Sequence, residues 1–490
     1  MVVADIARSG RAGSSPSSRT GYPRRQRICR VTPLTFSLWL ASGIVHSVSA
    51  AGIVADHNAP GHQQPTIMQT ANGTPQINIQ TPSAGGVSHN TYSQFDVSNH
   101  GVILNNSHKN VQTQLGGMVA GNPWLAKGEA RIILNEVNSR NPSQLNGFVE
   151  VAGKKAQVVI ANPAGISCDG CGFINANRAT LTTGQPQMKN GSLTGFNVER
   201  GEIRVAGKGM DASRTDYTDI IARSVKINAG IWAQDLKVTT GRNNVDIAHG
   251  QIEKKAADIS SKPQVALDVS SLGGMYAGKI RLVGTETGVG VRNAGHIGAQ
   301  AGAVTLTADG RIENSGSISA KTDVHLATTR ELHNSGSVYA GQDTQIQSDG
   351  AFTHTGSVAS RRDTRIQAAR LTGSERSLLA AGVKDDGRLA KTGELVISAS
   401  GELAAHGQLL AGGNMHLKGK GLDLSSSRIQ GQHTELDATS GNLSTQNAQL
   451  SAGILSARTV GQFSNNGGTI NADTLQISAQ SLSNHKGKLI

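Results

Sequence analysis

The sequence predicts an all-β chain wound as a parallel β-helix, in which successive coils stack their strands into long sheets. Three observations predict this fold. Gly accounts for 60 of the 490 residues and aromatic residues for only 3%, so the layers must be thin and built from small side chains. Short runs of alternating apolar and polar residues indicate strands, and no helical periodicity of any length is present. An apolar position also recurs about every 20 residues in the C-terminal half, as in a solenoid.

The composition and charge exclude several other classes of protein. Collagen, a coiled coil and a multi-pass membrane protein each need a different residue pattern. The net charge is +12, but residues 1–50 hold seven Arg and one Asp, so 7 − 1 = +6 of it lies there and 12 − 6 = +6 in the remaining 440 residues. Because half of the basic balance belongs to this first segment, we expect no nucleic-acid partner.

Residues 1–50 have the pattern of a secretory signal peptide. Four arginines between Arg24 and Arg30 precede a mostly apolar run, Val31 to Val45, and Val48-Ser49-Ala50 fits a small-x-small cleavage site. The apolar run is too short for a comfortable transmembrane span, although an amphipathic anchor is the alternative. We therefore expect signal peptidase and the general secretion machinery to act on this segment.

Residues 281–490 contain the repeat. The pattern Asn-x-Gly-x-(Ile/Val)-x-Ala begins at Asn293, Asn314 and Asn334, and a weaker copy begins at His354. The apolar position of the unit recurs at steps of 19 to 21 residues, with one longer step of 30, at Ile297, Ile318, Val338, Val358, Leu379, Leu409, Ile429, Leu450, Ile470 and Leu489. The long step coincides with residues 384–393, which we interpret as a solvated loop insertion.

A unit of this length, with two or three short strands and Gly/Asn turns, is one coil of a β-helix. Apolar residues are expected to stack on their equivalents, and Asn residues at equivalent turns can form side-chain ladders. His296, His333 and His354 occupy different positions relative to the repeat Asn, so we interpret them as surface residues and not as a metal ladder. The chain ends inside a unit, and we expect it to be a fragment of a longer protein or a truncated gene product.

Residues 51–280 are also rich in predicted strands. A Gly-Lys-Lys turn at 153–155 separates two of them, and the alternating runs predict strands at 130–135, 148–152, 156–161, 219–222, 225–228 and 235–239.

Two motifs in this region resemble the secretion domain of two-partner secretion exoproteins. Asn122-Pro123-Trp124-Leu125 is similar to the family signature NPNL, and Asn162-Pro163-Ala164-Gly165-Ile166 is similar to NPNGI. The third residue of each motif differs here. The family includes filamentous haemagglutinins, pore-forming haemolysins and contact-dependent inhibition toxins. The resemblance covers essentially residues 51–490, and it implies a secretion domain at 51–280 followed by filamentous repeats at 281–490.

The resemblance implies how the chain leaves the cell. A partner β-barrel transporter in the outer membrane would recognise the secretion domain in the periplasm and export the unfolded chain, which would fold outside as a right-handed β-helix. The protein would then be secreted or held at the cell surface. The resemblance also implies that the opening residues are the interior of an extended signal region, so we expect the true N-terminus to lie upstream of Met1.

The resemblance implies that the protein functions at the cell surface, either as an adhesin or as a toxin-carrying stalk of the contact-dependent inhibition type. A receptor on a host or neighbouring cell would then be a further partner. Two alternatives stay open, a pore-forming haemolysin of the same family and a β-helical polysaccharide-degrading enzyme. The Asn-Pro pairs also have two interpretations, as contacts with the transporter or as turn formers, because Asn-Pro favours turns by itself.

Cys168 and Cys171 form a lone C-x-x-C motif. It could be half of a zinc site, a redox pair or a local disulfide. Zinc needs four ligands and no second cysteine pair exists, while a thioredoxin-like pair expects a βαβ setting. Export leads to an oxidising environment, which favours the disulfide. Some haemolysin-type members of the family share this motif.

No catalytic, metal or cofactor site is predicted. The 34 acidic residues form no compact cluster, and the serine-hydrolase and zinc-protease motifs do not occur. Residues 273–279 have the spacing of a phosphate-binding loop, but Ile280 stands where a Ser or Thr would hold Mg²⁺. We therefore expect this chain not to be an enzyme.

Overall fold

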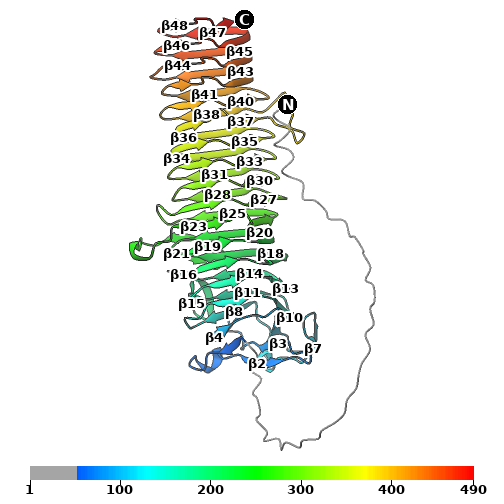
Figure 1. Cartoon of the computed structure of the whole chain (residues 1–490). Helices are drawn as coiled ribbons and strands as arrows, with labels where there is room; N and C mark the ends of the chain where they lie inside the picture. The colour runs from blue at the N-terminus through cyan, green and yellow to red at the C-terminus, as the bar shows by residue number, and fades with distance from the viewer. Residues whose placement is uncertain (1–51) are drawn as a thin grey trace, which may run out of the picture.

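Coils of three short strands stack along one axis in the computed structural model, which describes residues 52–490 (Figure 1). The predicted parallel β-helix is confirmed. The signal peptide predicted at residues 1–50 lies outside the described residues. Within residues 52–490 no helix is both long and apolar enough to cross a membrane.

Three parallel stacks make up the solenoid, and each regular coil gives one strand to each stack. The first stack holds β3 (Pro75–Asn78), β5 (Val102–Asn106), β10 (Phe148–Gly153), β13 (Cys171–Ile174), the first parts of β18 (Met210–Ala222) and β20 (Gly230–Thr240), β24 (Gly274–Ala277), β27 (His296–Ala299), β30 (Ser317–Ala320), β33 (Ser337–Ala340), β35 (Ser357–Ser360), β37 (Leu378–Ala381), β40 (Gln408–Ala411), the first parts of β43 (Arg428–Ala438), β45 (Gln449–Thr459) and β47 (Thr469–Ser478), and β49 (Lys488–Leu489).

The second stack continues some of the same strands around a corner. It holds β4 (Val87–Phe95), β8 (Ile132–Val137), β11 (Ala156–Ala161), β14 (Ala176–Thr182), the later parts of β18 and β20, β25 (Lys279–Gly284), β28 (Val304–Ala308), β31 (Val324–Thr328), the first parts of β34 (Thr344–His354) and β36 (Thr364–Gly373), β38 (Leu395–Ala399), β41 (Met415–Gly419), and the later parts of β43, β45 and β47.

The third stack closes each coil. It holds β9 (Ser143–Leu145), β12 (Ile166–Cys168), β17 (Glu202–Val205), β19 (Ser224–Ile227), β23 (Val265–Val269), β26 (Gly290–Asn293), β29 (Ile312–Asn314), β32 (Leu332–Asn334), the later parts of β34 and β36, β39 (Leu403–Ala405), β42 (Leu422–Asp423), β44 (Leu443–Ser444), β46 (Gln462–Ser464) and β48 (Ser481–Ser483).

The predicted repeat register is the register of the first stack. Each apolar position pairs directly with the next, from Ile297 with Ile318 to Ile470 with Leu489. In β28 the burial alternates along the strand, as the period-two sequence pattern requires. The inward side chains form one continuous apolar column through the molecule.

The Asn positions form the expected ladder, but His354 was wrongly interpreted as a surface residue. Asn293 donates from Nδ2 to Oδ1 of Asn314, and Asn314 donates to Oδ1 of Asn334, each at 2.8 Å. His354 is fully buried at the next rung. Its Nδ1 accepts from Asn334 at 3.3 Å and its Nε2 donates to the Leu378 carbonyl at 2.9 Å. The imidazole therefore replaces the Asn within the ladder.

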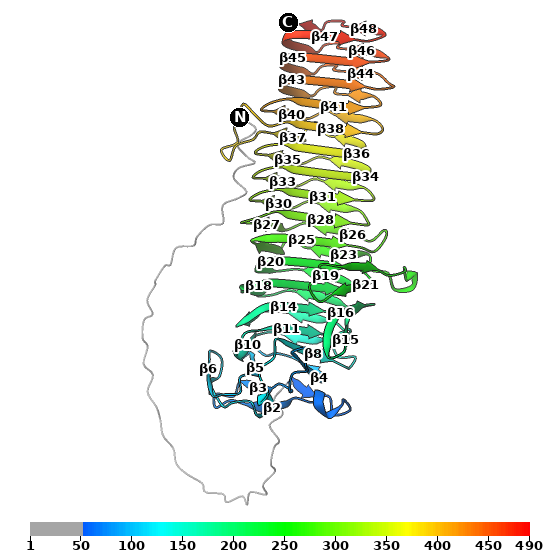
Figure 2. The ribbon, with the colours of Figure 1, turned by 180° about the vertical axis from the view of Figure 1, so that it is seen from behind.

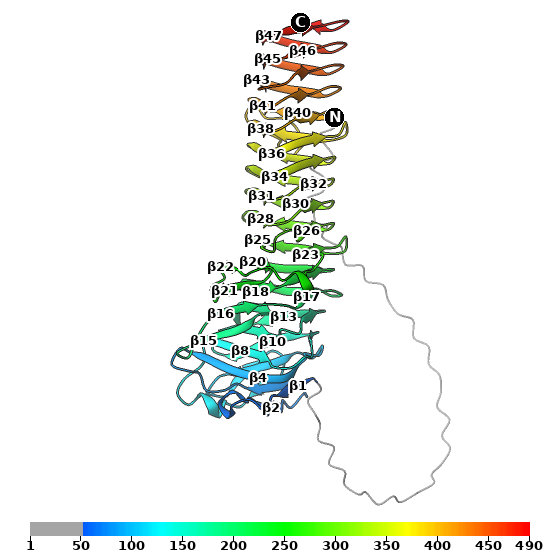
Figure 3. The same ribbon diagram turned by 90° about the vertical axis from the view of Figure 1, so that its left-hand side faces the viewer.

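Two departures from the regular coil lie in the first half of the chain (Figures 2 and 3). At the N-terminal end, β1 (Ile53–Ala55) and β2 (Thr66–Gln69) pair antiparallel with β4 and β3, and β6 (Val111–Thr113) forms a hairpin with β7 (Gly117–Val119). On one flank lies a four-stranded antiparallel side sheet. Its strands, in spatial order, are β15 (Gln185–Lys189), β16 (Ser192–Val198), β21 (Asn243–Asp246) and β22 (Ile252–Lys254).

The insertion predicted at residues 384–393 is a loop between β37 and β38, but it is not wholly solvated. Val383 bridges to Leu389 and is buried. Both pack with Tyr339 against the outer face of the first stack, where the Tyr339 hydroxyl donates to the Val383 carbonyl at 3.1 Å. Val383, which precedes the insertion, and Leu389, within it, pack the loop against the solenoid.

Candidate functional site

The first Asn-Pro motif forms a capped turn. Asn122 is the N-cap of a short 3₁₀ helix, η4 (Pro123–Leu125), and its Oδ1 accepts from the backbone N–H of Trp124 at 3.0 Å. Its Nδ2 donates to the carbonyls of Ile79 at 2.9 Å and Asn105 at 3.0 Å. Pro suits the first helical position because its missing N–H would be unpaired there in any case. Asn122 therefore joins three separate segments through one buried amide.

The outer part of this motif faces solvent. The side chain of Leu125 is fully buried, whereas Pro123 is exposed and Trp124 is 44% exposed. The indole Nε1 of Trp124 donates to the Thr66 hydroxyl at 3.2 Å, which lays the ring against β2. A partner could contact Pro123 and Trp124 in the folded chain, while Asn122 and Leu125 are out of reach.

The second motif repeats the same arrangement. Asn162 is fully buried, and its Oδ1 accepts from the backbone N–H of Ala164 at 2.9 Å. Its Nδ2 donates to the Asn141 carbonyl at 2.9 Å and to the Ser143 hydroxyl at 3.0 Å. Gly165 has φ of +122°, a value that strongly favours glycine. This turn connects β11 to β12.

The remaining residues of the second motif differ in exposure. Pro163 and Ala164 are half-buried, and Ile166 is buried as the first residue of β12, where it pairs with Ser143 and Ile203 of neighbouring coils. The two Asn-Pro motifs share no hydrogen-bond partner, so the fold uses them as two separate turns of the same design.

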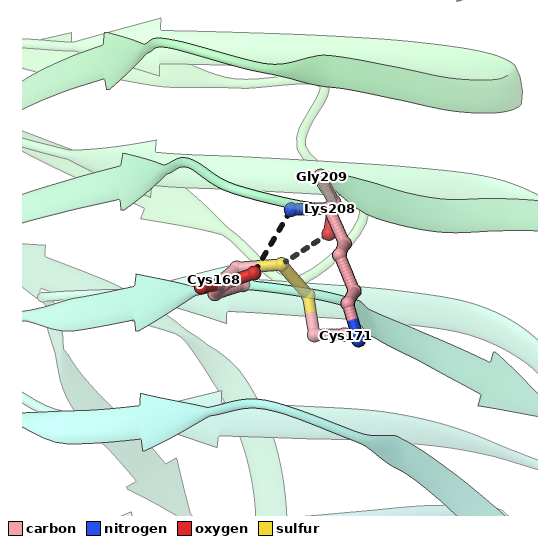
Figure 4. The surroundings of a disulfide bond; sticks show 5 residues. Cys168, Cys171, Lys208 and Gly209 are labelled. Atoms are coloured by element: carbon pink, nitrogen blue, oxygen red, sulfur yellow. Dashed lines mark hydrogen bonds between the residues drawn. A yellow bond between two sulfur atoms is a disulfide. The ribbon is translucent and has the colours of Figure 1, made fainter. Parts of the chain in front are cut away.

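Cys168 ends β12 and Cys171 begins β13, and their sulfurs are bonded (Figure 4). The Cα atoms are 5.4 Å apart. Both side chains are buried, and the Cys168 sulfur lies 3.3 Å from the Gly209 carbonyl of the next coil. The bond closes the corner between the third and first stacks. Within the described residues no three His, Cys, Asp or Glu side chains are grouped as a metal site.

A buried charged cluster lies beneath the side sheet, and no sequence motif predicted it. Asp219 on β18 is 2% exposed and accepts from Arg178 of β14 at 2.7 Å and from Nδ1 of His249 at 2.9 Å. Nε2 of His249 lies 2.6 Å from the Thr239 hydroxyl of β20. Nζ of Lys237 donates to the His249 carbonyl at 2.5 Å. His249 belongs to the turn between β21 and β22, so the cluster joins the side sheet to the solenoid.

Burial and hydrogen bonding oppose each other in this cluster. Burial raises the pKa of Asp219, but the hydrogen bonds from His249 and Arg178 outweigh it, and the pKa lies below its ordinary value. Burial lowers the pKa of His249, the charges of Lys237 and Arg178 lower it further, and together they outweigh Asp219, which raises it. Burial also lowers the pKa of Lys237. The sequence holds one feature that could have drawn attention to this cluster. His249 is the only histidine between His108 and His296.

Comparison with known proteins decides the family. Residues 51–314 match the family model described as the TPS secretion domain, which is more than half of the chain. The chain belongs to the two-partner secretion (TPS) family. Residues 316–384 match the haemagglutinin repeat. TPS exoproteins are secreted and displayed at the cell surface, and a TPS domain implies a cognate outer-membrane β-barrel transporter.

Several TPS relatives are similar in sequence. Toxin CdiA of Yersinia pestis is 65% identical over 328 residues, which cover 67% of this chain and 10% of that protein. The tRNA nuclease CdiA-2 of Burkholderia pseudomallei (strain 1026b) is 47% identical over 325 residues, 65% of this chain and 10% of that protein. A crystal structure of a filamentous hemagglutinin secretion domain is 33% identical, covers 61% of this chain and 97% of that one, and has a TM-score of 0.49. The chain thus spans about a tenth of the length of these curated relatives.

Proposed function

We propose that residues 51–490 form the secretion domain and the first part of the stalk of a toxin-carrying exoprotein of the contact-dependent inhibition type. The observation that carries the proposal is the TPS domain continuing without a break into haemagglutinin repeats on one solenoid axis. The stalk would present a distal effector to a neighbouring or host cell. The general secretion machinery and signal peptidase would bring the chain to the periplasm, where the transporter takes it.

We infer that this part of the molecule is not itself an enzyme. Relatives named as a tRNA nuclease and as a 16S rRNA endonuclease align with this region at 47% and 45% identity. A segment shared by proteins that are named for different activities does not determine either activity. A pore-forming haemolysin or a polysaccharide-degrading enzyme remains an alternative function, to be tested by red-cell lysis and by turnover of acidic glycans.

The boundary between domain and stalk is proposed near residue 281. From β25 onward the coils repeat at about 20 residues, apart from the 382–394 loop, whereas the side sheet interrupts the coils before it. The two motifs and the disulfide fall on the N-terminal side of this boundary, at residues 122–125, 162–166 and 168–171.

The motif asparagines are proposed to act as turn formers that the transporter requires. Both amides make all their hydrogen bonds inside the chain, which supports a role in shaping the turn. Pro123, Trp124, Pro163 and Ala164 would supply any direct contact. We propose that the disulfide fixes the corner after the second motif.

The test is export in a Gram-negative host with and without a cognate TPS transporter. We expect the full chain in the medium or on the cell surface only when the transporter is present. Retention in the periplasm with several TPS transporters would contradict the proposal, and the glycan-enzyme alternative would then be tested.

A further inference from the structure

The turn between β21 and β22 is held onto the solenoid by a group of contacts centred on one histidine. His249 has φ of +56° and is 1% exposed, so its imidazole is inserted into the body of the molecule. Its ring contacts Asp219 of β18 and Thr239 of β20, while Arg178 of β14 donates to the neighbouring Ala248 carbonyl at 2.8 Å. Residues of three coils of the solenoid thus form hydrogen bonds with a single turn of the side sheet.

The hydrogen bonds fit a neutral imidazole. A carboxylate only accepts, so Nδ1 of His249 carries the proton and donates to Asp219. Nε2 is then free to accept from the Thr239 hydroxyl at 2.6 Å. A second proton on the ring would force that hydroxyl to become the acceptor, and its own proton has no other partner among the described contacts.

The surrounding charges also oppose protonation. One buried carboxylate, Asp219, already pairs with the guanidinium of Arg178, and the ammonium of Lys237 donates to the His249 carbonyl. An imidazolium would add a third cation beside that single anion in a site with little water. The charged groups that face the cluster from all packed elements are Asp219 of β18, Arg178 of β14, Lys237 and Asp235 of β20, Asp246 of β21 and Arg281 of β25.

We propose that His249 is a pH-sensitive latch, which holds the β21–β22 turn on the solenoid at neutral pH and releases it on mild acidification. The apolar residues under the side sheet, among them Phe196, Val245, Val159 and Ile221, would become accessible as the turn opens. Arg242 keeps its ion pair with Glu199 at the other end of β21, so the opening is local.

The direction of the effect follows from linkage. The pKa of His249 is lowered in the docked state, so protons bind the released state more tightly. The stabilisation is fully present above the ordinary pKa of about 6.5 and is lost progressively as the pH falls below that value. Asp219 would act in the same sense, but only below about pH 4, because its ordinary pKa is that of a carboxyl.

The experiment is hydrogen exchange of the full chain, read by mass spectrometry and corrected for the intrinsic pH dependence of exchange. We expect protection of residues 246–255 to fall between pH 7.5 and pH 5.5, by at most about tenfold. That limit arises because, at pH 5.5, the protonated form of a free imidazole outnumbers the neutral form by about ten to one. Protection in residues 304–328 should not change. His249→Asn keeps the left-handed turn conformation and cannot titrate, so its protection should be the same at both pH values.

His325→Asn, on β31, is the matched control and should retain the wild-type fall. The proposal is overturned if wild-type protection is unchanged between these pH values, or if His249→Asn shows the same fall as wild type. Should that variant fail to fold, the wild-type profile still decides. Opening that begins only below about pH 4.5 would belong to a carboxylate and would contradict the latch.

Discussion

At the scale of single residues, the two motif asparagines explain why Asn and not another polar residue occupies each turn. An amide offers an acceptor to the backbone N–H two residues ahead and donors to two carbonyl or hydroxyl groups elsewhere. Asn122 and Asn162 use all three contacts. A carboxylate of the same shape could accept but could not donate. Trp124 and Ala164 depart from the family signatures. Neither side chain makes the set of three hydrogen bonds that the motif asparagines make.

Asn122→Ala should therefore destabilise the secretion domain. The loss of a cap costs about 1 kcal/mol, and each buried carbonyl left without a donor adds about 1–3 kcal/mol. We expect a total decrease of about 3–7 kcal/mol in the free energy of unfolding, measured by denaturant titration of the purified chain. Asn177→Ala, at an exposed position of β14, is the control. An unchanged midpoint for Asn122→Ala would contradict the structural role.

The sequence alone predicted these residues and left their role open, for a physical reason. The motif shows the turn, but the carbonyl partners of Asn122 belong to Ile79 and Asn105, which lie 43 and 17 residues away. Such contacts depend on which coil lies beneath the turn. The His249 cluster escaped prediction for the same reason, because its members come from four strands or turns between residues 178 and 249.

At the scale of the element, the register of the repeats was predictable because it is a property of spacing. Residues 20 apart with the same character must stack if the coil length is constant. The position of His354 was not predictable in this way. Its pattern places it at the Asn rung, yet histidine is intermediate between the mostly buried and the mostly exposed residue types, so the pattern does not predict its burial. Only the neighbouring Leu378 carbonyl shows that a buried imidazole can replace the amide.

The His354 rung makes the ladder sensitive to acid. Burial lowers the pKa of His354 to about 4, against the hydrogen bonds with Leu378 and Asn334 that raise it. Because the folded-state pKa is lowered, this stabilisation is complete above pH 6.5 and lost as the pH falls toward 4. The difference corresponds to roughly 3 kcal/mol. We expect wild-type unfolding midpoints to fall over this pH range.

His354→Asn would restore the repeat pattern at this rung and remove the titrating group. Its unfolding midpoint should depend less on pH between 6.5 and 4 than that of wild type, as followed by thermal melts in matched buffers. His485→Asn, at an exposed position of the last coil, should leave the pH dependence unaltered. Equal pH dependence in wild type and His354→Asn would rule out this role for the buried imidazole.

At the scale of the whole molecule, the chain is a stack in which each coil contacts only its neighbours. Stability and length are then close to sums over coils. The side sheet is the main exception. Its strands lie in two separate segments, 185–198 and 243–254, and pair antiparallel outside the solenoid. The alternating runs in the sequence predict no strand in either segment, and such a pattern would not distinguish a strand in the stack from one beside it.

Removing one whole coil should be tolerated. Deletion of residues 317–336 joins Gly316 to Ser337, which then takes the place of Ser317, its equivalent in the preceding repeat. We expect a folded solenoid shorter by about 4.8 Å, with an unchanged circular dichroism spectrum per residue and a slightly smaller maximum dimension in small-angle scattering. Deletion of residues 317–326 should instead lower the melting temperature strongly, because it places the turn at residues 329–331 where β30 should continue the first stack. Equal melting temperatures for the two deletions would contradict the stacked-coil account.

The most direct test of the central claim is transporter-dependent export of paired variants. The account predicts that wild type and Asn177→Ala appear outside the cell in the presence of the cognate transporter, and that Asn122→Ala and Asn162→Ala stay in the periplasm. The same preparations without transporter should release none of them. Export of Asn122→Ala and Asn162→Ala at the wild-type level would contradict the claim that the two Asn-Pro turns shape the domain that the transporter recognises.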